Sequence, residues 1–162
     1  MKNKLGRNIL IFIISIIIPL AVGISAAFLT MDSMDIYSSI KTPPLSPPSI
    51  LFPIVWTILY ILMGISSALV IINRQNDVEN ADIGIAYYAI SLAFNFVWSI
   101  IFFNFRNYLF AFIWLVILLY LIVRTIISYN KVLPIAAYLQ IPYALWVAFA
   151  GYLNIAIYFL NR

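Results

Sequence analysis

Five long apolar runs occupy most of this chain of 162 residues, and they constrain its fold more than any other feature. A run of about 20 apolar residues is what an α-helix needs to cross the hydrocarbon core of a bilayer. Only helices and closed barrels satisfy every backbone hydrogen-bonding group inside that core. The sequence therefore predicts an all-α integral membrane protein, a single five-helix transmembrane domain over residues 1–162. The helices are expected at about residues 8–29, 50–72, 83–103, 108–128 and 134–160.

Composition agrees with this class and excludes others. The chain is 65% hydrophobic and 9% charged, which is far more apolar than an ordinary soluble domain. Its net charge of +4 does not indicate a nucleic-acid partner, because the basic residues cluster at the N-terminus or stand singly at helix ends. Cysteine and histidine are absent, so we expect no metal centre, no thiolate nucleophile and no required cofactor.

Charges also bear on transport and on orientation. All five acidic residues fall in predicted connections, so no carboxylate lies at mid-membrane depth to relay protons. The N-terminal side carries six basic residues, and the opposite side carries three, Lys41, Arg106 and Arg162. The positive-inside rule then places the N-terminus in the cytoplasm, with a bacterial cell membrane as the expected location.

The first connection differs from the three short ones that follow it. It covers about residues 30–49 and contains Pro43, Pro44, Pro47 and Pro48. A loop of that length is usually functional or disordered, and prolines make it semi-rigid. We expect it to act as a lid over one end of the bundle.

Aromatic and neutral polar residues recur at helical spacing within the membrane. Two interpretations fit them: helix packing with an aromatic belt at the membrane interface, or a pocket walled by flat rings that suits a planar apolar ligand such as a tetrapyrrole. An unpaired mid-helix amide such as Asn95 costs several kcal/mol in hydrocarbon, so Asn95 must meet another helix, water or a ligand. The stripes are Trp56, Tyr60 and Gly64; Ser91, Asn95 and Ser99, with Trp98 nearby; and Pro142, Trp146, Phe149 and Leu153.

Three segments resemble the translocator protein family, also called tryptophan-rich sensory proteins. They read YSSIKTPPLSPPSILFPIVWTILYILMG over residues 37–64, NFVWSIIFFNFRNYLFA over residues 95–111, and PYALWVAFAGYLNIAIYFLN over residues 142–161. The chain departs from the family pattern at Leu45 and Ile50, where tryptophan is usual, and at Ile155, which bears on cholesterol contact.

The resemblance implies a five-helix bundle, usually a homodimer, with a pocket under the first loop that binds porphyrins or other planar hydrophobic molecules, and with membrane lipid around it. Small residues such as Gly23, Ala26, Ala27 and Ala111 could serve a dimer interface or internal packing equally well. The matching ligand-binding positions are Tyr37, Trp56, Tyr60, Asn95, Trp98, Trp146, Ala150 and Leu153.

Three functions remain open at this point. The first is a membrane receptor or sensor that binds porphyrins. The second is an enzyme that degrades porphyrin with light and oxygen, for which the resemblance implies Trp56 and Trp146 as catalytic residues. The third is a transporter of porphyrin or sterol-like lipid.

Overall fold

The computed structural model describes residues 2–33 and 39–162 and is helical throughout its main elements. Each of the five long helices is apolar and long enough to span a membrane, and none of the described residues lies in a β-strand. This confirms the predicted fold class. The long helices are α1 (Lys2–Thr30), α3 (Leu51–Ile72), α4 (Val78–Ser99), α5 (Tyr108–Val132) and α6 (Pro134–Leu160). Three short elements join them, the 3₁₀ turns η1 (Met31–Ser33) and η2 (Arg74–Asn76) and the π-helical turn η3 (Ile100–Asn104).

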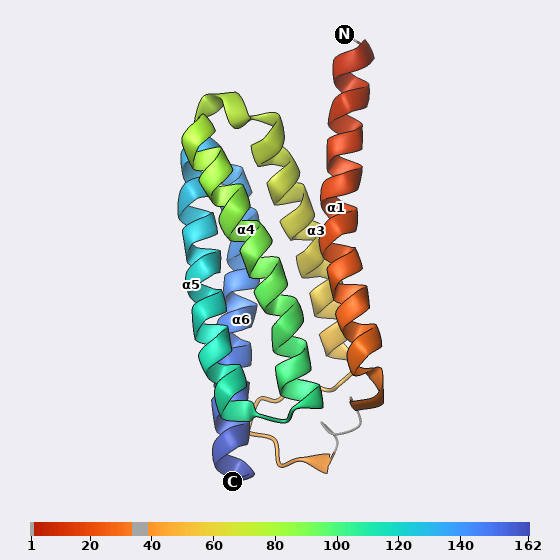
Figure 1. Ribbon diagram of the computed structural model, residues 1–162, viewed down its shortest axis with the longest axis vertical. Helices are drawn as coiled ribbons and strands as arrows, with labels where there is room; N and C mark the ends of the chain where they lie inside the picture. Colours follow the sequence, from red (N-terminus) through yellow and green to blue (C-terminus); the bar gives the residue numbers. More distant parts are fainter. Residues whose placement is uncertain (1, 34–38) are drawn as a thin grey trace.

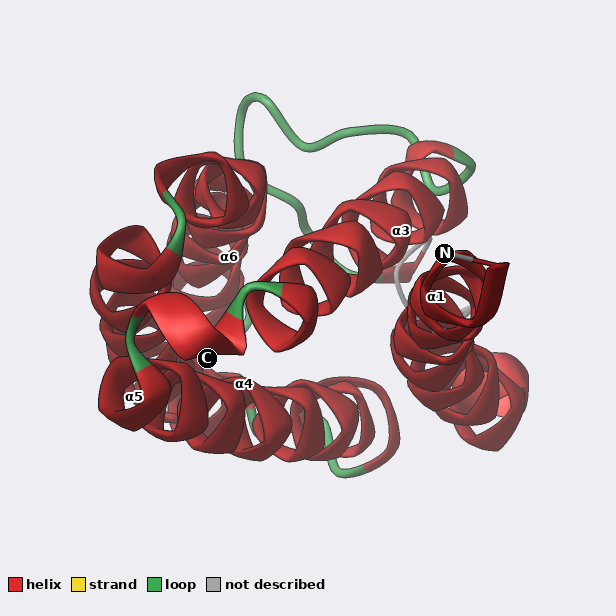
Figure 2. Ribbon diagram, turned by 90° about the horizontal axis from the view of Figure 1, so that it is seen from above, coloured by secondary structure: helices red, strands yellow, loops and turns green. Residues whose placement is uncertain are grey.

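Consecutive helices run antiparallel and enclose a common interior (Figure 1). Around the bundle, α1 packs on α3, α3 on α6, α6 on α5 and α5 on α4, while α1 also touches α4 (Figure 2). The N-terminus and the α3–α4 connection lie at one end. The first connection, the α4–α5 turn and the C-terminus lie at the other end, which we call the loop end.

Two helices begin earlier than the apolar runs indicate. Helix α1 already begins at Lys2, and α4 begins at Val78 rather than near Ile83. The start of α4 is fixed by Asp77, whose carboxylate accepts a hydrogen bond from the backbone N–H of Asn80 at 3.0 Å. This bond also holds the pKa of Asp77 below its usual value. An apolar run marks the membrane crossing, whereas the helix continues into water until a cap ends it.

The backbones of α1 and α3 lie close together at Gly64. A Cβ atom on this glycine would lie 2.6 Å from both the Cα atom of Ile16 and the carbonyl oxygen of Ser15. Such contacts with backbone atoms leave room only for hydrogen at this position. Small residues at helix interfaces allow this kind of backbone approach in membranes.

Buried hydrogen bonds join α3 to α5 and α6 in the half of the bundle away from the loop end. The hydroxyl of Ser66 donates to the carbonyl oxygen of Ala136 at 2.7 Å and accepts from the side-chain amide of Gln140 at 3.2 Å. The hydroxyl groups of Ser67 and Tyr129 lie 3.1 Å apart. These neutral polar groups act between helices because hydrocarbon offers them no other partner.

The described part of the first connection is attached to α6. The backbone N–H of Lys41 donates to the side-chain oxygen of Asn161 at 2.9 Å, and the Asn161 amide donates back to the Lys41 carbonyl at 2.9 Å. The hydroxyl of Tyr152 donates to the carbonyl oxygen of Pro44 at 3.0 Å. The next residue, Leu45, has a φ of 69°, a conformation that favours glycine. A role for this connection as a lid stays a prediction.

Replacing Gly64 with alanine should lower the free energy of unfolding by about 1–3 kcal/mol, because the new methyl group forces the α1 backbone away from α3. The matched control is Gly151→Ala, where the added Cβ would meet ring atoms of Phe112 at ordinary contact distances of 3.9 and 4.0 Å. The free energy of unfolding of both variants and of the wild type is measured in mixed detergent micelles. Equal stabilities would contradict the close packing of α1 on α3.

Candidate ligand-binding site

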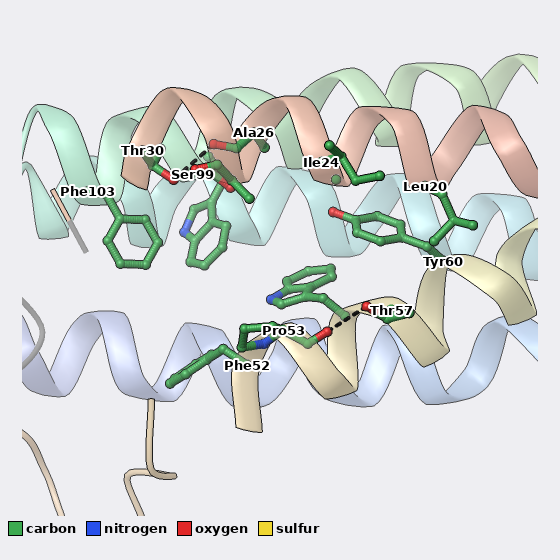
Figure 3. Close-up of a pocket in the computed structure, with 14 residues that line it drawn as sticks. Leu20, Ile24, Ala26, Thr30, Phe52, Pro53, Thr57, Tyr60, Ser99 and Phe103 are labelled. Carbon is green, nitrogen blue, oxygen red and sulfur yellow. Dashed lines mark hydrogen bonds between the residues drawn. The ribbon is translucent and has the colours of Figure 1, made fainter. Parts of the chain in front are cut away.

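A cavity of about 300 Å³ lies between α1 and α3 in the half of the bundle nearer the loop end, and the end of α4 closes its third side (Figure 3). Every residue in its lining is apolar, aromatic or neutral polar. The cavity therefore offers contact area and a few hydroxyl groups, and it offers no charge. Its walls include Leu20, Gly23 and Thr30 from α1, Phe52, Trp56 and Tyr60 from α3, and Trp98, Ser99 and Phe103 from α4 and η3.

Trp56 is the central side chain of the aromatic wall. Its ring stacks on that of Tyr60 with centroids 5.5 Å apart, and it lies 6.2 Å from the ring of Trp98. In Figure 3 the Tyr60 ring extends from α3 toward α1. It can do so because α1 has a glycine there: a Cβ atom on Gly23 would lie 2.2 Å from a ring carbon of Tyr60.

Behind this wall, Asn95 connects three helices. The Tyr60 hydroxyl donates to the Asn95 side-chain oxygen at 2.8 Å, and the Asn95 amide donates to the Tyr143 hydroxyl at 3.2 Å. Asn95 is buried, with 1% of its surface exposed. Its amide thus finds its partners on α3 and α6, which offsets the cost of placing it in the membrane.

A second polar pair fixes the orientation of Trp98. Its indole N–H donates to the side-chain oxygen of Asn154 on α6 at 3.2 Å, while the Asn154 amide donates to the Ala150 carbonyl at 2.7 Å. The indole N–H is consequently turned toward α6, and the ring forms part of the cavity wall. Among the described residues, no three side chains of the His, Cys, Asp or Glu type lie together as a metal site would require.

The structure brings together some of the residues expected to bind a ligand and separates others. Trp56, Tyr60 and Trp98 line the cavity, and Asn95 lies directly behind it. Trp146, Ala150 and Leu153 do not line it; Ala150 and Leu153 are buried, and Trp146 is half-buried against the edge of Phe52 with centroids 6.1 Å apart. Tyr37 lies outside the described residues. Ligand contact by all eight residues remains a prediction.

Several residues of the site carry no strong sequence signal. The sequence does not predict which residues of α1 line the cavity. Because α1 is apolar on every face, hydrophobic periodicity does not mark the side that faces the cavity. The sequence indicates only a role in dimerisation or packing for Gly23, Ala26 and Ala27, whereas all three line the cavity. Ala111 from the same set is buried inside the bundle. Tyr143, the partner of Asn95, stands one residue from the predicted stripe on α6.

Most of the chain matches a known protein family. Residues 15–160 match the model of the TspO/MBR family. The chain belongs to the TspO/MBR family. It is 36% identical to the "Tryptophan-rich protein TspO" of Chlorobaculum tepidum over 160 residues, which covers 97% of this chain and 99% of that protein.

Other TspO/MBR relatives are named as sensors and translocators. The chain is 29% identical to the "Tryptophan-rich sensory protein" of Cereibacter sphaeroides, over 77% of this chain and 76% of that one. It is 30% identical to the human "Translocator protein", over 83% of this chain and 80% of that one. These matches confirm the predicted family. Together with the five membrane-spanning helices, they also confirm that the chain is a multi-pass membrane protein.

Replacing Asn95 with leucine should lower the free energy of unfolding by about 1–3 kcal/mol, because the hydroxyl groups of Tyr60 and Tyr143 lose their buried partner. The control is Thr125→Val, which removes a buried hydroxyl whose bond at 3.0 Å runs to Leu121 of its own helix. We expect a smaller loss there, since the carbonyl of Leu121 belongs to the backbone of an intact helix. If both variants were equally stable, the hydrogen bonds of Asn95 to α3 and α6 would not contribute measurably to the stability of the bundle.

Proposed function

We propose that this TspO/MBR protein is a membrane receptor or sensor that binds a planar apolar ligand of the porphyrin class in the cavity between α1, α3 and α4. The observation that carries the proposal is the wall formed by Trp56, Tyr60 and Trp98 beside a lining without charge. Flat rings offer a large contact area to a flat ligand. The names of several relatives as sensors and translocators support a receptor role.

Affinity at such a site comes mostly from apolar burial and ring contacts. Burial contributes roughly 25 cal/mol per Å² of apolar surface, reduced by the cost of immobilising the ligand. An aromatic pair adds about 0.5–1.5 kcal/mol when its geometry is favourable. Polar selectivity has to come from neutral polar groups in the lining, such as the hydroxyl groups of Thr30 and Ser99.

The shape of the cavity supports partial enclosure of the ligand. Its volume of about 300 Å³ is at the low end of the range for drug-sized ligands. Ile24 on α1, which is 68% exposed, and Thr57 on α3 both belong to the lining and to the outer surface. A tetrapyrrole disc could enter edge first between α1 and α3, with its remainder in lipid.

We further propose a cell-membrane location with the N-terminus in the cytoplasm. The support is the excess of basic residues on the N-terminal side, six against three, since lysine and arginine favour cytoplasmic connections. The protein requires no cofactor in this proposal, because porphyrin is the ligand that it detects.

Trp56→Leu should weaken protoporphyrin binding about tenfold, because the variant loses the central ring of the wall. The matched control is Trp114→Leu, which removes a tryptophan that stacks on Phe94 at 4.3 Å between α4 and α5. Titrations followed by porphyrin absorbance in the dark measure the affinity without photobleaching. Gel filtration establishes that each variant is folded.

Unchanged affinity of a folded Trp56→Leu variant would contradict the proposed site. Trp146→Ala provides a graded comparison, because Trp146 does not line the cavity but contacts Phe52, which does. We expect it to weaken binding less than Trp56→Leu does. An effect of Trp146→Ala larger than that of Trp56→Leu would place the ligand on the α6 side of Phe52 instead.

A further inference from the structure

A second cavity, of about 390 Å³, lies at the loop end between the α4–α5 turn and the end of α6. It shares no lining residue with the aromatic cavity. In Figure 1 the α4–α5 turn and the C-terminus lie at this same end of the bundle. Its polar lining includes Arg106 and Asn107 from the turn and Tyr158, Asn161 and Arg162 from the end of the chain.

Both arginines of this cavity are without an acidic partner among the side chains that the structure describes. The ion pair found among those side chains joins Arg74 to Asp82 at the opposite end of the bundle. Arg162 lies over the ring of Phe159, 4.9 Å from its centroid. Stacking of this kind uses the face of the guanidinium group and leaves its N–H edges available.

Arg106 is held by an unusual backbone. Its φ of 54° lies in the left-handed region, which is uncommon for a residue with a side chain. Both neighbours are fixed: the N–H of Phe105 donates to the Ile100 carbonyl at 3.1 Å, and the Asn107 side chain accepts from the N–H of Phe110 at 3.2 Å. The turn therefore places Arg106 at a defined position between η3 and α5, at a conformational cost typical of functional positions.

A third basic residue is brought to the same place from far along the chain. Asn161, which lines the cavity, exchanges two hydrogen bonds with the backbone of Lys41. Arg106 and Arg162 line the cavity themselves, whereas Lys41 is attached to its edge through the backbone hydrogen bonds with Asn161. The sequence predicts that these basic residues lie on one side of the membrane, but it does not show that Arg106 and Arg162 line one cavity.

We propose that this cavity binds a phosphate group, with Arg106 and Arg162 as its ligands. Guanidinium groups donate planar, paired hydrogen bonds that match the geometry of phosphate oxygens. The hydroxyl groups of Tyr108 and Tyr158, which also line the cavity, supply neutral donors beside them. The ends of membrane-spanning helices lie at the depth of lipid headgroups, so the phosphate belongs either to an anionic phospholipid or to a soluble phosphate.

The test compares two double variants with equal charge loss. Arg106→Gln with Arg162→Gln removes the proposed ligands, and Arg7→Gln with Lys131→Gln removes two exposed charges from the opposite end. Each variant lowers the formal net charge from +4 to +2, because each loses two positive charges. Native mass spectrometry of the detergent-purified full chain, titrated with phosphatidylglycerol, gives the lipid affinity.

We expect the arginine variant to bind phosphatidylglycerol at least about fivefold more weakly than the wild type, because the attraction of a single basic side chain to an anionic lipid already accounts for a factor of about five. The lipid affinity of the control variant should change little. Adding inorganic phosphate distinguishes the two sources. Displacement of the lipid at millimolar phosphate supports a soluble phosphate as the natural ligand, and resistance supports the lipid headgroup.

Arg106→Lys provides a further check, because it keeps the charge and loses the paired donors. Lipid affinity between that of the wild type and that of the double variant supports direct recognition. The proposal would be overturned if the arginine variant bound phosphatidylglycerol as tightly as the wild type does and also bound phosphate as tightly. An equal loss in the control variant would overturn it too, since net charge alone would then explain the binding.

Discussion

The absence of water in the bilayer core determines how this bundle is built, because a polar group left there without a partner in the protein costs several kcal/mol. Asn95 meets Tyr60 and Tyr143, and Gln140 meets Ser66. Each of these bonds joins different helices, so the few polar side chains also fix which helices are neighbours. Apolar side chains could not do this alone, since lipid is as good a partner for them as another helix.

The same constraint explains the character of the aromatic cavity. A charged lining would need compensation that hydrocarbon does not provide. The polar groups nearest the cavity are therefore largely turned into the bundle, as the Tyr60 hydroxyl is toward Asn95 and the Trp98 N–H is toward Asn154. What remains toward the cavity is the flat surface of the rings, which suits a ligand recognised by shape and apolar area.

Sequence reasoning predicts the five helices well because length and apolarity are what a membrane crossing demands. It also selects Trp56, Tyr60 and Asn95, since spacing of four residues places polar and aromatic groups on one face of a helix. It does not distinguish the cavity side of α1, whose apolar residues face lipid or cavity alike, and it does not separate Trp146 from Trp56. That distinction depends on how α3 and α6 are rotated, which no local pattern records. The sequence does not predict the cavity with the two arginines at the loop end either. Its lining comes from the α4–α5 turn and the end of α6, which are far apart along the chain.

The aromatic cavity persists because α1 is fixed on either side of it. On one side, α1 and α3 are in backbone contact at Gly64. On the other, the side-chain amide of Asn104 in η3 donates to the carbonyl oxygen of Leu29, near the end of α1, at 3.1 Å. Between these points the Tyr60 ring occupies the space next to Gly23 and keeps the two helices apart. An apolar hollow in a packed core is normally lost by collapse of its walls, which restores dispersion contacts. Here collapse would disturb the backbone contact at Gly64 or the hydrogen bond to Leu29, so the space remains open for a molecule that fills it.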